Sequence, residues 1–177
     1  MTFRPDSSLL LVIDLQQRLM PVISGSEDVV ANTVKLTEVA RLLGVPVMAT
    51  EQNPHGLGPS LPAIKRLVTS TLAKMLFDAT REPAWPTFLP PGRPDFVVTG
   101  CEAHICVLQT VLGMLAGGHA VRVVMDATGS RTPVNQDAAM RRLETAGAEI
   151  VTTEMVVFEW LGTAAHPKFR DALKWIK

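Results

Sequence analysis

Residues 42–47 read LLGVPV, which joins the end of a helix to a glycine stop and the start of a strand. Gly44 follows the apolar stripe of a helical segment at 28–43, and glycine just past a helix is a common C-terminal stop. The same arrangement returns in AGGHAVRVV (116–124) and ETAGAEIV (144–151). Helices and strands that alternate over short connections imply right-handed crossovers and a parallel sheet.

The apolar runs rich in β-branched residues are the predicted strands. Each run is almost continuously hydrophobic, as expected for strands covered on both faces. A further short strand is expected near 67–72, and helices are expected at 107–116 and 135–146. Together these elements predict one domain over residues 1–177, with three α/β/α layers and a mostly parallel sheet of about six strands. The five principal strand runs are 8–14, 45–50, 95–100, 120–126 and 148–153.

Composition narrows the class of protein. The chain has 177 residues, 47% of them hydrophobic, which suffices for a packed core and argues against disorder. Lys plus Arg and Asp plus Glu both total 17, so the net charge is zero. The sequence has neither a basic stripe for nucleic acid nor an apolar run of the roughly 20 residues that span a bilayer. We therefore expect a protein that acts on a small molecule, away from nucleic acids and membranes.

The cysteines and the N-terminus indicate a cytoplasmic protein. Cys101 and Cys106 lie five positions apart, and a bridge between them would close a very small loop, so we expect reduced thiols. The apolar run at the N-terminus stops at Asp14 without a small-residue cleavage site. That run is interpreted as the first strand, not as a signal peptide.

Ligands of open parallel sheets bind beyond the carboxyl ends of the strands, so the residues that close the strands matter most. Asp14 closes the first strand and is either a turn residue or a functional carboxylate. Lys74 lies in the apolar stretch LVTSTLAKMLF (67–77), where it is either a solvated surface charge or, if buried, in need of a carboxylate partner.

Cys106 follows the strand DFVVTG by six residues, at the start of an apolar helix. Unpaired N–H groups and the helix dipole are expected to lower the pKa of a thiol in that position and favour the nucleophilic thiolate. The alternative is a small buried hydrophobic residue. Cys101, at the strand end, is interpreted as structural, with a pKa raised by its apolar setting.

Five segments in order resemble the isochorismatase-like cysteine hydrolase superfamily, and most closely its isochorismatase domain-containing branch. The resemblance covers nearly the whole chain and implies a Rossmann-like sheet and an Asp-Lys-Cys triad. By motif match, Asp14 is the base, Lys74 the stabilising cation and Cys106 the nucleophile that forms a thioester. The segments are LVIDLQQRLMP (11–21), VPVMATEQNPHGLGP (45–59), AKMLFDA (73–79), VVTGCEAHICVLQT (97–110) and VVMDATGSR (123–131).

The resemblance also implies an oxyanion hole made by the backbone N–H groups of Glu102 and Cys106, and a cis peptide between Cys101 and Glu102. The family commonly has threonine where this chain has Ala103. The Asp-x-His metal arrangement of the nicotinamidase branch is absent, since the loop offers only Glu51 and His55. We therefore expect neither a catalytic metal nor another cofactor.

Substrate contacts are expected from Gln17, Gln52, Phe77 and His104. The family is usually oligomeric, so a homo-oligomer is expected. Three aromatic side chains are the candidates for its interface, Trp85, Phe158 and Trp160.

The function expected from these residues is hydrolysis of a small amide or related carbonyl compound at a non-peptide carbon–nitrogen bond. Two alternatives remain. Hydrolysis of a vinyl ether of the isochorismate type needs the acid but no nucleophilic cysteine, so Cys106 counts against it. A non-catalytic interaction scaffold that keeps the fold is the other alternative, and the altered Ala103 leaves room for it.

Overall fold

The computed structural model describes residues 2–176 and contains one six-stranded sheet whose neighbouring strands are all parallel. The strand order is β3-β2-β1-β4-β5-β6, so the chain builds outward from β1 in two directions. The expected parallel α/β architecture is confirmed. The strands are β1 (Ser8–Ile13), β2 (Val47–Gln52), β3 (Ser70–Lys74), β4 (Asp95–Cys101), β5 (Ala120–Gly129) and β6 (Glu149–Val151).

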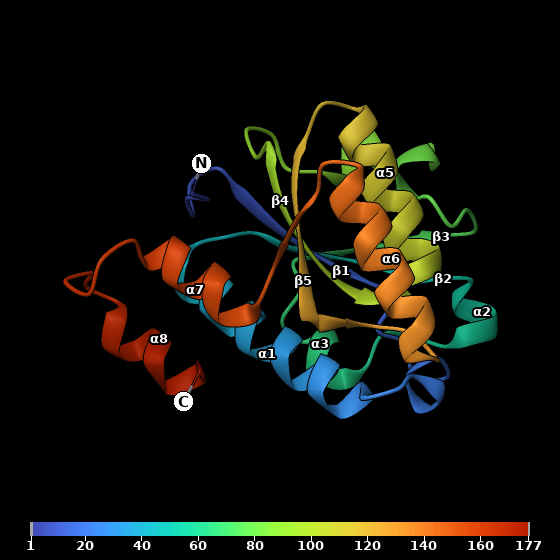
Figure 1. Cartoon of the computed structure of the whole chain (residues 1–177), viewed down its shortest axis with the longest axis horizontal. Coiled ribbons are helices and arrows are strands. Elements are labelled where there is room, and N and C mark those ends of the chain that lie inside the picture. The colour runs from blue at the N-terminus through green and yellow to red at the C-terminus, as the bar shows by residue number, and fades with distance from the viewer. Residues whose placement is uncertain (1, 177) are drawn as a thin grey trace.

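Helices cover both faces of the sheet, with α5 and α6 on one side and α1, α7 and α8 on the other (Figure 1). The α-helices are α1 (Ser26–Leu43), α2 (Pro54–Leu57), α3 (Pro62–Lys65), α4 (Trp85–Phe88), α5 (Leu108–Ala116), α6 (Pro133–Thr145), α7 (Thr153–Leu161) and α8 (Phe169–Ile176). Two 3-10 turns, η1 (Met20–Val22) and η2 (Ala79–Arg81), and one π-helical turn, η3 (Ala103–Val107), complete the elements.

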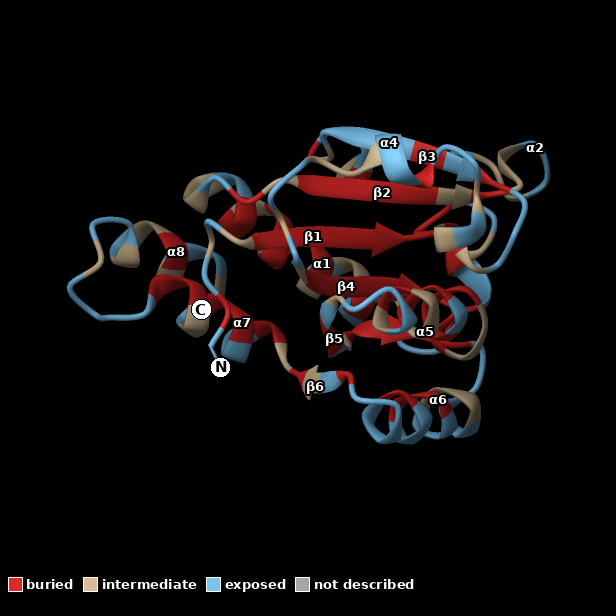
Figure 2. Ribbon diagram, turned by 90° about the horizontal axis from the view of Figure 1, so that it is seen from above, coloured by how far each residue is buried: buried red, intermediate tan, exposed pale blue. Residues whose placement is uncertain are grey.

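The central strands are buried on both faces because successive side chains point to opposite sides. In β1, Leu10 and Val12 join the core beneath α1 and α7, while Leu9 and Leu11 join the core beneath α5 and α6. All six residues of β1 are buried, and the strand is buried along its length in Figure 2. The continuous apolar pattern of the sequence therefore corresponds to two hydrophobic cores, one on each face of the sheet.

The carboxyl ends of β1, β2, β3 and β4 meet at one edge of the sheet. The register pairs Ile13 with Thr50 on one side and with Gly100 on the other. Gly100 has φ +122°, and a Cβ there would overlap the carbonyl of Ile13. Glycine is therefore required where β4 passes β1, just before the chain turns away from the sheet.

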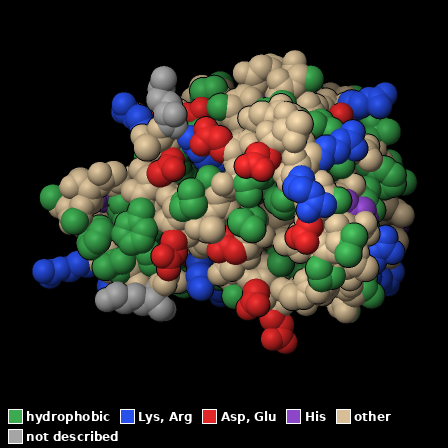
Figure 3. Space-filling model, in the orientation of Figure 1, with side chains coloured by type: hydrophobic (Ala, Val, Ile, Leu, Met, Phe, Trp, Pro, Cys, Tyr) green, Lys and Arg blue, Asp and Glu red, His purple; other side chains and the backbone are tan. Residues whose placement is uncertain are grey.

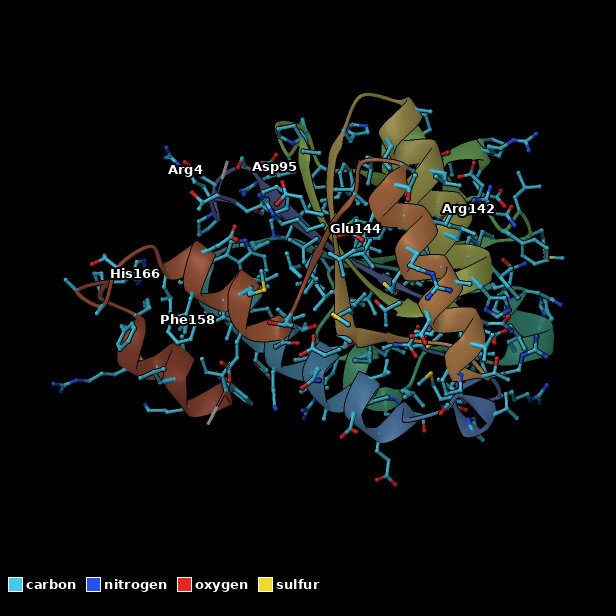
Figure 4. The ribbon with its side chains drawn as sticks, in the orientation of Figure 1. Arg4, Asp95, Arg142, Glu144, Phe158 and His166 are labelled. Carbon is cyan, nitrogen blue, oxygen red and sulfur yellow. The ribbon has the colours of Figure 1, made fainter. Side chains whose placement is uncertain are left out.

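Several details differ from the expectation. Strand β3 begins three residues later than expected and ends two residues later, at Lys74. Helices α7 and α8 were not expected. Trp85 and Trp160 are buried, so the surface of this chain does not offer them for the interface expected of them. Trp160 packs beneath α1 and donates its indole N–H to Ser8. Phe158, which is labelled in Figure 4, is exposed. Its ring centroid lies 6.4 Å from that of Phe169 in α8.

Basic and acidic side chains both occur on the face shown in Figure 3, in keeping with the balanced charge of the chain. Across residues 2–176, none of the helices combines the length and apolar character that a bilayer crossing would need.

Candidate active site

Asp14 comes directly after β1 and is completely buried. Its φ of 52° lies in the left-handed region, which is uncommon for a residue other than glycine and occurs often at functional sites. Oδ1 accepts a hydrogen bond of 2.6 Å from the Thr50 hydroxyl, and Oδ2 accepts one of 2.8 Å from Lys74 Nζ. The sharp turn therefore aims the carboxylate at the ends of β2 and β3.

Lys74 is the last residue of the edge strand β3, and its side chain has no exposed surface. Besides the bond to Asp14, Nζ donates a 2.7 Å hydrogen bond to Gln52 Oε1. A buried ammonium is stable only with a charge partner and hydrogen bonds, and Lys74 has both. The alternative of a solvated surface lysine is thereby excluded.

Cys106 lies inside the π-helical turn η3 and not at the first residue of α5. Its Sγ is 3.8 Å from Gln52 Oε1, which brings the thiol beside the Asp14–Lys74 pair. The carbonyl of Glu102 accepts the N–H groups of Ile105 (3.1 Å) and Val107 (3.2 Å), the residues on either side of Cys106. The peptide bond between Cys101 and Glu102 is cis, as the resemblance implied.

The pKa of Cys106 differs in direction from the sequence expectation. Burial, followed by the negative charge of Asp14, raises the pKa of the thiol from 9.0 to about 12, while Lys74 acts in the opposite sense. The expected lowering by the helix terminus is wrong, because desolvation outweighs it. Burial also raises the pKa of Cys101 to about 12, which confirms the expectation for that residue. Cys106 therefore rests as a neutral thiol.

Gln52 links these groups through both ends of its side-chain amide. Its Nε2 donates to the carbonyl of Met75 at 2.8 Å, which orients Oε1 toward Lys74 and Cys106. Gln16 holds the backbone of Gln52 from both sides, accepting its N–H at 2.8 Å and donating to its carbonyl at 3.0 Å. Gln52 is thus built into the framework of the site.

A cavity of about 100 Å³ opens beside Cys106. Asp14, Gln52, Glu102 and Cys106 form its polar wall. The apolar wall consists of Leu19, Leu57, Phe77 and Ile105.

Two of the four expected substrate contacts, Gln52 and Phe77, border this cavity. The other two do not: Gln17 is exposed, and His104 Nδ1 lies 3.0 Å from Ser130 Oγ. Sequence reasoning missed Leu19 and Ile105, because a single apolar side chain carries no chemical signal of its own. Thr50 is among the strand-closing residues that the sequence points to, but its hydrogen bond to Asp14 follows from the register that sets it beside β1.

Glu102 is the second acidic residue that borders the cavity, and its side chain is 8% exposed. Oε2 accepts the backbone N–H of Arg131 at 3.1 Å and its Nε at 2.9 Å. Arg131 approaches from outside the cavity, with 55% of its side chain exposed.

The potential metal donors of the loop after β2 are engaged or solvated. Glu51 Oε1 accepts both the N–H and the hydroxyl of Ser60, and His55 is exposed. Within the described part of the chain, no three His, Cys, Asp or Glu side chains are grouped as a metal ion would require.

Comparison with known proteins identifies the family of this chain. Residues 8–155 match the family model of the isochorismatase domain. The human isochorismatase domain-containing protein 2 is 36% identical over 173 residues, which cover 98% of this chain and 84% of that protein. The structure of the MAR1 ribonuclease from Caenorhabditis elegans is 32% identical, with a TM-score of 0.93 over 99% of this chain and 92% of that one.

The fold also matches an octameric Escherichia coli hydrolase of unknown specificity, the YcaC gene product, at 20% identity. The TM-score is 0.88 over 98% of this chain and 95% of that chain. On the family model and the human relative, this chain belongs to the isochorismatase-like hydrolase family.

Proposed function

We propose that this protein is a cysteine amidohydrolase that cleaves small amides or related carbonyl compounds through a thioester on Cys106. The observation that carries the proposal is the buried Asp14–Lys74 ion pair beside the Cys106 thiol at the wall of a cavity. A structural ion pair would not need a thiol and a cavity next to it. A thiol nucleophile does need an adjacent base and an access route.

The first half-reaction begins with Cys106 as a thiol. Asp14 takes the thiol proton as Sγ forms a bond to the carbonyl carbon, which avoids a free thiolate of high pKa. The carbonyl oxygen becomes an oxyanion, which the backbone N–H groups of Glu102 and Cys106 stabilise. Asp14 then gives its proton to the nitrogen as the carbon–nitrogen bond breaks, and the amine leaves behind a thioester.

The second half-reaction uses the same carboxylate. Asp14 takes a proton from water as the water oxygen attacks the thioester carbonyl. The carbon–sulfur bond breaks, the proton returns to Sγ, and a carboxylic acid leaves. Throughout the cycle, Lys74 holds Asp14 in place and balances its charge in the buried site.

Ammonia release from a panel of small primary amides tests the proposal. The wild type should turn over at least one of them, Cys106→Ala should turn over none, and Cys101→Ala should remain active because its thiol does not border the cavity. Pyruvate release from isochorismate that survives Cys106→Ala would instead establish vinyl-ether hydrolysis. If no amide or isochorismate is consumed, the scaffold alternative holds.

We also propose that the protein is a homo-oligomer. Phe77, which borders the cavity, is 50% exposed, Met75 beside it in the sequence is 66% exposed, and Trp175 of α8 is 40% exposed. Apolar side chains of this size commonly mark contacts between chains. The octamer of the E. coli neighbour is a precedent within the fold. Light scattering coupled to size-exclusion chromatography measures the assembly directly, and a mass of 19.2 kDa would refute it.

A further inference from the structure

The size of the cavity beside Cys106 limits what can react there. Its volume of about 100 Å³ compares with the roughly 300–1,000 Å³ of pockets that hold drug-sized ligands. A water-sized group occupies roughly 15 Å³ on the same measure, so the cavity holds roughly seven such groups. The reacting molecule is therefore a short one, with a few carbon atoms next to its carbonyl group.

The charges around the cavity have one sign. Asp14 and Glu102 both border it. The cations that balance them do not: Lys74 has no exposed side-chain surface and is already bonded to Asp14 and Gln52. Arg131 approaches Glu102 from the solvent side, where water screens its charge. A ligand in the cavity thus lies beside two acidic residues and no basic one, in a partly desolvated setting that strengthens electrostatic interactions.

We propose that Glu102 is a specificity-determining residue that restricts the site to small uncharged carbonyl compounds and excludes those that carry a carboxylate. This inference rests on the proposed role of Cys106 as the reacting group. A carboxylate in the cavity loses its water, meets the charge of Glu102 and finds Lys74 already engaged. An amide of the same shape meets none of these costs, and its N–H groups can donate to Glu102.

The exclusion of carboxylates by Glu102 is called the charge rule below. Two alkylating reagents of nearly the same shape test it without any turnover. Iodoacetamide is neutral and iodoacetate carries a carboxylate. The rate of Cys106 labelling is followed by peptide mass mapping, and each rate is divided by that for a free cysteine peptide at the same pH. After this correction, iodoacetamide should label Cys106 faster than iodoacetate by about tenfold or more. Equal corrected rates would overturn the proposal.

Variants then assign the effect to one side chain. Glu102→Gln should bring the ratio of the two corrected rates close to one, whereas Glu102→Asp should keep it high. Arg131→Ala removes the exposed counter-charge and should raise the ratio further. The Arg131 variant changes only a half-exposed side chain, so it provides a second result should Glu102→Gln fold poorly. A ratio that changes in none of these variants would show that Glu102 does not discriminate.

Turnover provides a separate readout. Isovaleramide and malonamate have the same shape, but only malonamate is charged, and kcat/KM should favour isovaleramide by about tenfold or more. An amide with a phenylpropyl chain should react poorly because of its size. Failure of every amide with a preserved alkylation ratio would refute the amidohydrolase function and keep the charge rule. Turnover of malonamate at the rate of isovaleramide would refute the charge rule and keep the function.

Discussion

The side-chain oxygen of Gln52 lies 2.7 Å from Lys74 Nζ and 3.8 Å from Cys106 Sγ. One amide thus contacts both the buried cation and the thiol, while its Nε2 is held by the carbonyl of Met75. We therefore expect Gln52 to act as a positioning residue that sets where the ammonium of Lys74 lies relative to Asp14.

Gln52→Leu, which keeps the approximate size of the side chain, should lower kcat with little change in KM. A hydrogen bond to a charged group contributes about 1.5–3 kcal/mol, which corresponds to a loss of roughly 10- to 150-fold. Gln109→Leu changes an exposed glutamine of α5 and is the matched control, with activity expected to match the wild type. Steady-state kinetics of both variants, on any amide that the wild type turns over, measures these changes in kcat and KM. A rise in KM alone would show that Gln52 contacts substrate directly.

The Asp14–Lys74 pair makes a prediction about stability. Lys74→Met leaves the Asp14 carboxylate buried without a counter-charge, which should lower the free energy of unfolding by about 3–5 kcal/mol. Combining it with Asp14→Asn removes both charges and should recover much of that loss. Urea unfolding of the two single variants and the double variant forms the required cycle. Additive losses in the double variant would mean that the two side chains are not coupled.

The raised pKa of Cys106 predicts a particular pH profile. The alkylation rate should increase about tenfold per pH unit through pH 9, because the thiolate fraction keeps growing until the pKa of about 12 is reached. A free cysteine peptide, whose thiol has a pKa near 9.0, should level off above that pH. Asp14→Asn should shift the profile to lower pH, since the charge of Asp14 raises the pKa of the thiol. A wild-type rate that is already constant below pH 7 would contradict this assignment.

The raised pKa of Cys106 also makes the stability of the folded protein depend on pH. Below pH 9 both folded and unfolded chains hold the Cys106 proton, so stability is unaffected. Between pH 9 and about 12 the unfolded chain loses this proton and the folded chain retains it, so stability falls with rising pH. Cys101→Ala, which removes the other thiol with a pKa of about 12, should reduce the fall. Thermal unfolding measured from pH 8 to 11 provides the comparison.

Gly100→Ala should prevent correct folding, because its Cβ would overlap the Ile13 carbonyl at a φ of +122°. The matched control is Gly118→Ala, where φ is +82° but no atom lies within 4 Å of the added Cβ. That variant should lose only about 1–2 kcal/mol from the unfavourable backbone conformation. Soluble yield and melting temperature separate the two. A stable Gly100→Ala protein would show that β1 and β4 can move apart.

Much of the fold followed from the sequence, because continuous apolar runs and glycine stops have a direct physical meaning. β1 and β4 were predicted nearly to the residue, and the motif match brought Asp14, Lys74 and Cys106 together. Their proximity depends on the strand order, which no local pattern encodes. The direction of the Cys106 pKa shift was predicted wrongly because burial is a property of the whole packed structure.

Lys74 belongs to an edge strand. β3 pairs only with β2, and three of its five residues are exposed. Edge elements with few buried contacts open at lower free energy than the centre of a sheet. Detachment of β3 would separate the ammonium from Asp14 while β1 and β4 stay paired. Heat inactivation should then precede melting of the domain, and the amides of 70–74 should exchange with deuterium before those of β1. The durability of this site is therefore set by its outermost strand.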